Sequence, residues 1–180
     1  MKDFYTVDIC GREEKLPVIP LPSCVNICFF NLHGNVELTE HCAKHVAEKV
    51  KKHNPDVLIT AESKGLQITH CVARNLGQQF YAVARKTRKL YMQDGIEVQA
   101  KTITTGEVQH LYLSAHDVNL IKGKRVAIID DVISTGAANA ALEQLVERAG
   151  GTVVCRAFVL AEGDAKDRPD IEYLAAIPLL

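Results

Sequence analysis

The chain has 180 residues, of which 47% are hydrophobic and 24% charged, and its formal net charge is −1. These values are ordinary for a globular protein, and the length suits one domain with a sizeable core. A net charge near zero provides no general attraction to nucleic acid or to an anionic membrane, and no apolar run approaches the roughly 18 residues that span a bilayer. The six cysteines are scattered, as expected for reduced thiols in a cytoplasmic protein. We therefore expect a single domain over residues 1–180, with neither nucleic acid nor a membrane as its partner.

The first part of the chain, residues 1–36, has the least regular pattern. The proline-rich stretch Leu16–Pro22 breaks any helix and keeps the backbone extended. The apolar run Ile27–Phe30 follows, and a turn is predicted at 33–35. Apolar side chains at helical spacing then predict a helix over 37–53.

A metal-binding pattern overlaps this region. Cys24, Cys28, His41 and His45 have the spacing of a ββα zinc finger, in which thiolate and imidazole ligands close a tetrahedral site. The predicted helix is long enough to belong to a larger domain, however, and the segment lacks the basic residues of a finger that reads DNA. The zinc finger is therefore kept as an alternative, and metal analysis of the purified protein is its test.

The next polar loop is suited to bind an anion. Glu62–Gly65 follows a short buried strand predicted at 57–61 and opens a helix predicted at 66–76. The free N–H groups and positive dipole end of a helix N-terminus favour an anion. Lys64 adds a positive charge to this loop, and Gly65 lets the backbone approach a ligand closely.

A strongly basic run ends the strand that is predicted at 79–84. Four of the next five residues are cations: Arg85, Lys86, Arg88 and Lys89. Taken alone, such a run is a solvated loop or a generic basic patch. Beside loops that bind phosphate it is better suited to hold a diphosphate.

The most informative pattern follows another short strand. The strand-favouring residues Val126–Ile129 end in two adjacent carboxylates, Asp130 and Asp131. The turn Ser134–Gly136 and an Ala-rich helix that begins at about Ala137 come next. In open α/β sheets ligands bind at the carboxyl ends of strands, and a helix N-terminus suits a phosphate. Two acids beside an anion site suit a sugar phosphate, because carboxylates accept hydrogen bonds from ribose hydroxyls.

The remaining segments complete an α/β pattern. A hairpin is predicted from strands at 100–105 and 109–113, which turn near Gly106. A helix at 137–149 and strands at 152–160 and 173–177 follow. Alternating strands and helices predict an α/β fold with a mostly parallel central sheet and helices on both of its faces.

These motifs resemble a known enzyme family. The stretch Asp130–Gly136 and its preceding strand resemble the phosphoribosyl pyrophosphate (PRPP) signature of the type I phosphoribosyltransferases. Glu62–Gly65 is similar to the pyrophosphate loop of that family, and residues 85–89 match its Arg-Lys-x-x-Lys pattern. The resemblance extends from about residue 20 onward. It implies the type I phosphoribosyltransferase fold, with a small N-terminal hood at 1–36 and a mobile loop and β-hairpin at 91–113.

The resemblance also implies a reaction, in which a 5-phosphoribosyl group moves from PRPP to a purine nitrogen and pyrophosphate is released. Asp130 and Asp131 are then the expected catalytic residues; they hold the ribose hydroxyls, and Mg²⁺ is the cofactor, held mainly through substrate and water. The 5-phosphate is expected at Ser134, Thr135, Gly136, Ala137 and Ala138. The pyrophosphate is expected at Ser63, Lys64, Arg85, Lys86 and Lys89. The base is expected at Phe29, Phe30, Asn31 and Val132.

The acceptor base must be inferred from departures within the family. The xanthine enzymes place a Lys where this chain has Gly163, and its absence favours adenine. The adenine enzymes carry a Glu in the mobile loop, for which Glu97 is the candidate substitute here. Ala137 and Ala138 replace a second hydroxyl residue that often closes the phosphate loop, as in the xanthine enzymes. We therefore expect a purine phosphoribosyltransferase that prefers adenine, with xanthine or hypoxanthine/guanine as alternative bases.

Two further expectations concern partners. In the family, the basic loop often reaches the pyrophosphate of the neighbouring subunit, so the resemblance implies a homodimer that shares these residues. A different class of function is a PRPP-sensing regulator without catalysis, for which the weak match in the mobile loop leaves room. Such regulators attach a DNA-binding domain, and the chain has neither the length nor the basic helix for one.

Overall fold

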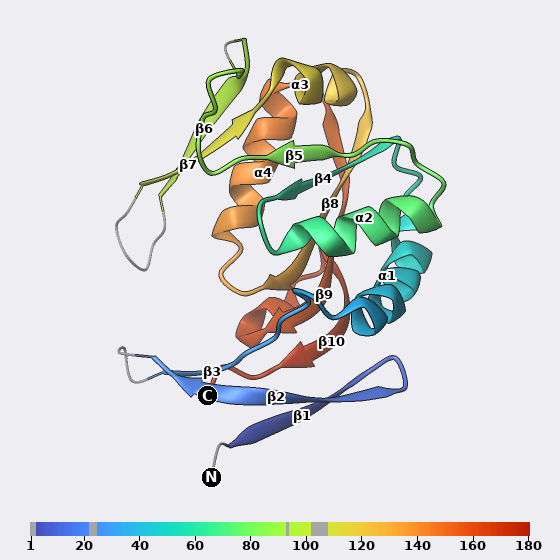
Figure 1. Ribbon diagram of the computed structural model, residues 1–180, viewed down its shortest axis with the longest axis vertical. Helices are drawn as coiled ribbons and strands as arrows, with labels where there is room; N and C mark the ends of the chain where they lie inside the picture. The colour runs from blue at the N-terminus through green and yellow to red at the C-terminus, as the bar shows by residue number, and fades with distance from the viewer. Residues whose placement is uncertain (1–2, 22–24, 93, 102–107) are drawn as a thin grey trace.

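The computed structural model describes residues 3–21, 25–92, 94–101 and 108–180. Its centre is a parallel sheet of five strands in the order β10-β9-β8-β4-β5 (Figure 1). The strands are β4 (Val57–Ala61), β5 (Ala82–Ala84), β8 (Arg125–Ile133), β9 (Thr152–Glu162) and β10 (Glu172–Ile177). The α/β fold with a mostly parallel central sheet is therefore confirmed.

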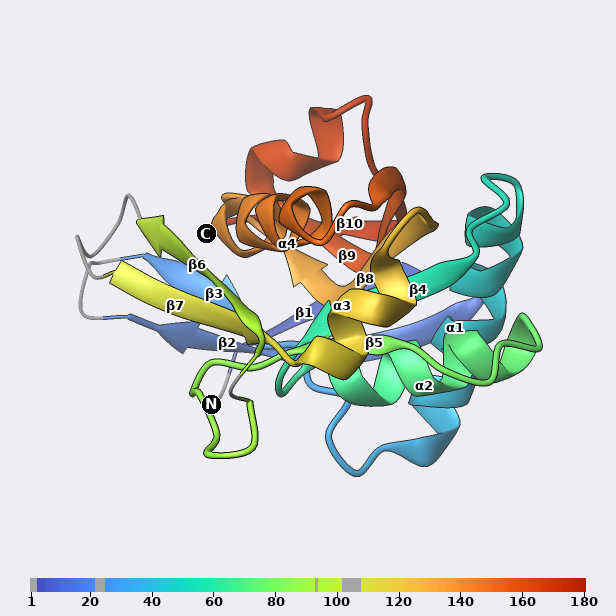
Figure 2. The ribbon, with the colours of Figure 1, turned by 90° about the horizontal axis from the view of Figure 1, so that it is seen from above.

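Helices cover both faces of this sheet (Figure 2). The helices α1 (Val36–Lys51) and α2 (Gly65–Asn75) pack on one face, and α4 (Ala137–Arg148) packs on the other. A short helix, α3 (Ala115–Ile121), contacts β5, and the 3₁₀ helix η1 (Gly163–Asp167) follows β9. Within the described part of the chain, no helix is both long and apolar enough to cross a membrane.

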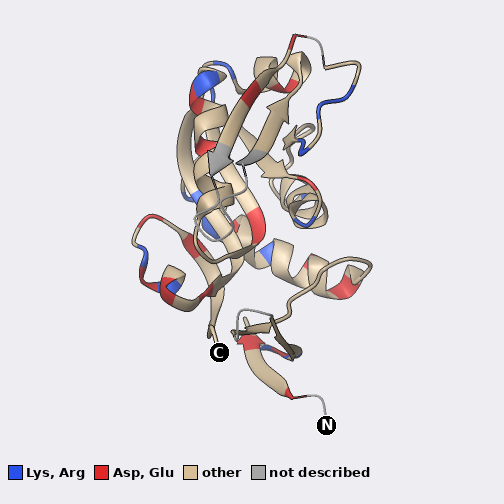
Figure 3. Ribbon diagram, turned by 90° about the vertical axis from the view of Figure 1, so that its left-hand side faces the viewer, with Lys and Arg blue, Asp and Glu red and all other residues tan. Residues whose placement is uncertain are grey.

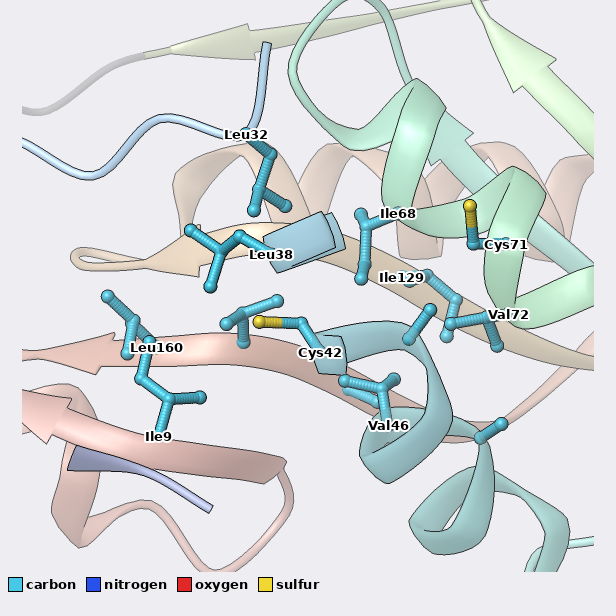
Figure 4. Packing of buried hydrophobic residues seen from close by; sticks show 14 of the residues in the cluster. Ile9, Leu32, Leu38, Cys42, Val46, Ile68, Cys71, Val72, Ile129 and Leu160 are labelled. Carbon is cyan, nitrogen blue, oxygen red and sulfur yellow. The ribbon is translucent and has the colours of Figure 1, made fainter. Parts of the chain in front are cut away.

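The larger core fills the space between α1, α2 and the sheet. In Figure 4 the side chains of Cys42 and Val46 on α1 lie between Leu160 of β9 and Ile129 of β8. All four side chains are almost completely buried. This packing is stabilising because it removes apolar surface from water, and it fixes the strand that ends in Asp130. The carboxylates at the end of β8 are thus carried by a strand that packs into the larger core.

The N-terminal segment is more regular than the sequence pattern predicted. The strands β1 (Phe4–Ile9), β2 (Arg12–Pro20) and β3 (Asn26–Cys28) form an antiparallel sheet below the central one in Figure 1. Cys10 and Gly11 join β1 to β2 with φ values of 53° and 84°, which is the left-handed geometry of a two-residue hairpin turn. Cysteine is not a usual residue at such a turn, which is why the sequence pattern did not reveal this hairpin. The extended backbone predicted from Leu16 onward is confirmed by β2 as far as Pro20.

Other strand boundaries also differ from the predicted ones. The hairpin consists of β6 (Ile96–Lys101) and β7 (Val108–Leu113), so its first strand begins four residues earlier than predicted. Val98 on β6 is buried beside α4, and burial of this face sets the strand register. The predicted turn near Gly106 lies outside the described residues. The strand predicted at 79–84 is shortened to β5, since Phe80 is largely exposed.

The helix α3 was not predicted at all. Ser114 is its N-cap, and the Ser114 hydroxyl accepts a hydrogen bond from the backbone N–H of Asp117. Serine followed three residues later by an acid is a sequence signal for a helix start. The helix has only two turns and little apolar periodicity, which explains why the segment did not stand out.

Candidate active site

The carboxyl ends of β4 and β8 meet where the winding of the sheet reverses. From β4 the chain passes through α2 to β5 on one side, and from β8 it passes through α4 to β9 on the other. Parallel sheets leave a ligand crevice at such a point. A pocket of about 360 Å³ lies there. Its polar lining includes Ser63, Lys64, Lys86, Asp130, Asp131 and His33.

Asp130 and Asp131 form a compact carboxylate pair at the end of β8. Asp131 is only 5% exposed, and its Oδ2 lies 3.5 Å from Lys64 Nζ. The Asp131 backbone N–H donates to Asp130 Oδ1 at 2.9 Å. Burial raises the pKa of Asp130, and the neighbouring charge of Asp131 raises it further. A ligand that brings hydroxyl donors or a cation to this pair relieves the repulsion between the two acids.

Gly65 allows α2 to begin in direct contact with β4 and β8. A Cβ atom at this position would lie 2.0 Å from Thr60 Oγ1 and 2.8 Å from Asp130 Oδ1. No residue with a side chain fits there without displacing one of these atoms. The sequence interpretation assigned this glycine to close approach of a ligand. The structure shows a close approach to the protein's own β4 and β8, which sets the N-terminus of α2 beside the acids.

A second pocket, of about 200 Å³, lies at the N-terminus of α4. Its lining contains the whole predicted phosphate loop: Ser134, Thr135, Gly136, Ala137 and Ala138. Gly136 caps the helix in a left-handed conformation with φ of 81°. The N–H groups that open a helix have no partner within the helix, and they are the donors that a phosphate uses. Asp130 and Ala138 line both pockets, so the two pockets meet at the carboxylate pair.

The basic loop between β5 and β6 is the blue segment at the upper right of Figure 3. Three of the five predicted pyrophosphate residues are on this loop; of these, Lys86 lines the larger pocket, whereas Lys89 lies on the exposed loop outside it. The Arg85 guanidinium bonds Glu62 at 3.2 Å, and the Lys86 backbone N–H donates to the same carboxylate at 2.8 Å. Burial opposes the charge of Glu62, but these two donors outweigh it and lower the pKa of Glu62. Arg85 is thus held by an acid of its own chain.

The four predicted base-binding residues lie in different surroundings. Phe30 is 2% exposed and belongs to the core, so the expectation that it stacks on a base is corrected. Phe29 is 38% exposed, and Lys64 Nζ lies 5.5 Å from the centre of its ring. The Asn31 side-chain oxygen accepts from the His33 backbone N–H at 3.1 Å, which builds a local turn. Val132 lines the smaller pocket.

Glu97 does not lie near the carboxylate pair. It is on β6, and its carboxylate pairs with His110 on β7. It lines a smaller pocket with Arg88 and Tyr112, and that pocket shares no lining residue with the one that contains Asp131. The structure therefore does not support Glu97 as a substitute for the acidic residue of the mobile loop.

The alternative zinc site is not supported by the described residues. Cys24 lies outside them, and Cys28 is buried on β3. His41 and His45 lie inside α1, where the His41 ring bonds the backbone oxygen of Ile9 at 2.7 Å. The described part of the chain contains no group of three or more His, Cys, Asp or Glu side chains arranged to hold a metal ion.

A polar network beneath the phosphate loop was missed by the sequence interpretation. Asn139, in the first turn of α4, is 4% exposed and lines the smaller pocket. Its amide nitrogen donates to Glu143, which accepts two hydrogen bonds from Arg156 of β9 at 2.7 and 3.0 Å. Arg156 lowers the pKa of Glu143. The network fixes the start of α4 to the sheet, and no sequence motif indicates a pairing between residues so far apart.

Comparison with known proteins agrees with this geometry. The family model described as "Phosphoribosyl transferase domain" matches residues 31–176. An adenine phosphoribosyltransferase of Rhodospirillum centenum is 28% identical over 92% of this chain and 94% of its own. A xanthine phosphoribosyltransferase of an Exiguobacterium species is 31% identical over 84% of this chain and 81% of its own.

Solved structures show the same fold. APRTase from Giardia lamblia, in complex with 9-deazaadenine, is similar with a TM-score of 0.74 and 19% identity, over 90% of this chain and 93% of its own. The adenine phosphoribosyltransferase of Rhodothermus marinus has a TM-score of 0.70 and 24% identity, over 97% of this chain and 94% of its own. With the family match over most of the chain and the acids, loops and sheet in place, this protein belongs to the phosphoribosyl transferase family.

Proposed function

We propose that the protein is a purine phosphoribosyltransferase with adenine as its preferred acceptor, and that residues 1–180 act as one catalytic unit. The observation that carries the proposal is the pair Asp130 and Asp131 between two helix N-termini at the sheet's switch point. PRPP has the same order of groups, with a ribose between a phosphate and a diphosphate. The carboxylates would accept from the ribose hydroxyls, and the two loops would bind the phosphates.

The charges around the pocket suit a transfer that separates charge. A bond forms between the purine nitrogen and ribose C1, while the bond from C1 to the diphosphate oxygen breaks and its electron pair leaves with pyrophosphate. The proton on the purine nitrogen is released to water or to the departing pyrophosphate. Lys64 and Lys86, together with Arg85 and Lys89, would bind the departing diphosphate, and the hydroxyl of Ser63 would add a hydrogen bond. Asp131 would place negative charge near the developing cation at C1.

Mg²⁺ is proposed as the cofactor. The carboxylates of Asp130 and Asp131 are the hard oxygen ligands that this ion prefers. They are only two, and the described residues contain no cage of three or more such ligands around them. This donor set fits an ion that is bound mainly through the oxygens of PRPP and water, with the two acids in an indirect role. When bound there, Mg²⁺ neutralises charge on the diphosphate.

The preference for adenine rests on the residues around the base. Gly163 opens η1 and offers no cation to a purine oxygen, unlike the Lys that the xanthine enzymes place at this position. Phe29 is exposed beside Lys64 and remains the aromatic residue of the hood that a base can reach. Several curated relatives are named adenine phosphoribosyltransferases, and one is named a xanthine phosphoribosyltransferase.

A cytoplasmic homodimer is part of the proposal. Lys89 lies outside the pocket of its own chain, and the neighbouring Leu90 and Tyr91 are 96% and 70% exposed. A second copy that covers these apolar side chains would also receive Lys89 at its own pyrophosphate site. The thiols of Cys10, Cys28, Cys42, Cys71 and Cys155 are free, which suits a reducing compartment.

The test is nucleotide formation from PRPP and Mg²⁺ with adenine, hypoxanthine, guanine or xanthine as the acceptor. The proposal predicts the highest kcat/KM with adenine, and release of one pyrophosphate for each AMP formed. A protein that binds PRPP but turns over none of the four bases would be a sensor instead. A preference for xanthine or guanine would support the proposed reaction but contradict the proposed preference for adenine.

A further inference from the structure

His33 and Gln67 join the N-terminal hood to the pyrophosphate loop. His33 lies in the turn before α1 and lines the same pocket as Lys64 and Asp131. Gln67 lies in the first turn of α2, and its amide group is 2.7 Å from His33 Nδ1. The two residues are far apart in the sequence, so their contact depends on the fold. This contact connects the base side of the site to the phosphate side.

The hydrogen bonds of Gln67 determine which nitrogen of His33 carries its hydrogen. In one orientation of the amide group both of its polar atoms are satisfied. Its nitrogen then donates to the backbone oxygens of Ser63 and Lys64, each at 3.3 Å, and its oxygen accepts from His33 Nδ1 at 2.7 Å. In the opposite orientation, the amide oxygen faces only acceptors. Nδ1 is therefore the protonated nitrogen, and Nε2 of the neutral ring is an acceptor.

A neutral acceptor at this place distinguishes between purines. Lys64 and Lys86 are donors that suit phosphate oxygens, and the two carboxylates suit the ribose hydroxyls. An imidazole acceptor from the hood instead suits an N–H donor on the base. Adenine presents an amino group at C6, whereas hypoxanthine, guanine and xanthine present a carbonyl oxygen there. An oxygen at C6 would meet the Nε2 lone pair and leave both acceptors unpaired.

We propose that His33 Nε2 accepts a hydrogen bond from the 6-amino group of adenine and thereby selects this base. Gln67 is a positioning residue, because it holds the imidazole in the required tautomer and ties it to the backbone at Ser63 and Lys64. The assignment rests on the proposed function, since it names the base contact of that same site. It also provides a source of adenine specificity in a chain where Glu97 lies elsewhere.

The test compares adenine with unsubstituted purine, which has the same rings and lacks the amino group. We measure kcat/KM for both bases in the wild-type protein and in His33→Phe. The expected result is that the adenine-to-purine ratio falls roughly tenfold in the variant, the worth of one neutral hydrogen bond. The kcat/KM for purine should fall less than that for adenine, because purine offers no amino group to Nε2. His33 is exposed, so the thermal unfolding midpoint should change little.

Two amide variants form a matched pair. The His33→Gln side chain reaches the position of Nε2 and should keep most of the adenine preference, whereas His33→Asn reaches only the position of Nδ1 and should lose it. Gln67→Leu should lower the ratio less than His33→Phe, because the imidazole remains but is free to rotate.

The outcomes separate the inference from the function on which it rests. Wild-type protein that makes no nucleotide from either base contradicts the proposed function, and the His33 assignment with it. Active wild-type protein whose adenine-to-purine ratio is unchanged in His33→Phe overturns the assignment alone. Equal losses for both bases with a raised KM for PRPP also overturn it, because His33 would then contact the phosphates.

Discussion

Gly65→Ala tests how closely the loop Glu62–Gly65 is built onto the carboxylate pair. The added methyl carbon would lie 2.0 Å from Thr60 Oγ1 and 2.8 Å from Asp130 Oδ1, and the Ile129 backbone oxygen is 3.3 Å away. Thr60 is fully buried and β-branched, so its hydroxyl cannot move aside freely. The start of α2 must therefore shift away from β8. Overpacking of this kind costs about 1–3 kcal/mol of stability.

Thermal unfolding measures the loss of stability, and PRPP kinetics measure the displacement of the loop. A loss of about 2 kcal/mol lowers the thermal midpoint of a chain of this length by about 4–8 °C. Because the loop moves with α2, the KM for PRPP should rise as well. Thr60→Ala removes the shortest contact, so Gly65→Ala should cost about 1 kcal/mol less in that background. A Gly65→Ala protein with wild-type stability and wild-type KM for PRPP would refute the close approach described above.

Three further predictions concern the hood, the loop and the acids. In urea unfolding, Phe30→Ala should lower the free energy of unfolding by about 3–5 kcal/mol. Phe29→Ala should lower it by about 1 kcal/mol or less and raise the KM for the base. Equal losses of stability in the two variants would contradict the different burial of the two rings. Lys64→Met should change stability by less than about 1 kcal/mol, since the side chain is half exposed, but raise the KM for PRPP about tenfold or more; an unchanged KM would remove Lys64 from the site. Because the pKa of Asp130 is raised, its native carboxyl binds a proton more tightly than the unfolded one, so stability falls as pH rises above the ordinary carboxyl range, about 4. Between about pH 5 and pH 8, the free energy of unfolding should decrease with pH in the wild type and decrease less in Asp130→Asn. Equal slopes of this free energy against pH in the two proteins would contradict the raised pKa of Asp130.

The parts of the site that the sequence predicts well are contiguous in the chain. The strand, acids, turn and helix from Val126 to Leu142 follow one another directly, and each has its own local signal. The same holds for β4, the loop Glu62–Gly65 and α2. Alternation of such units also predicts the parallel sheet, because strands joined by helices pair in parallel.

The parts that were missed depend on contacts between distant segments. Phe29 and Phe30 are neighbours in the chain, and only the tertiary structure decides which ring enters the core. Arg85 has the spacing of a phosphate ligand, but its bond to Glu62 appears only when β4 and β5 pair. The contact between His33 and Gln67 likewise needs the hood to lie against α2. Sequence motifs therefore predicted which loops meet at the carboxyl ends of the strands better than they predicted the surroundings of the hood residues.

The most direct test of the account compares pyrophosphate release from PRPP and adenine by the wild type and by Asp131→Asn. Asn has the same shape as Asp, so the variant should fold, which its unfolding midpoint will check. If Asp131 holds the ribose and stabilises the developing cation, the wild type releases pyrophosphate with each AMP, and the variant is slower by about a hundredfold or more. A folded Asp131→Asn protein with the wild-type rate would contradict the role given to the carboxylate pair.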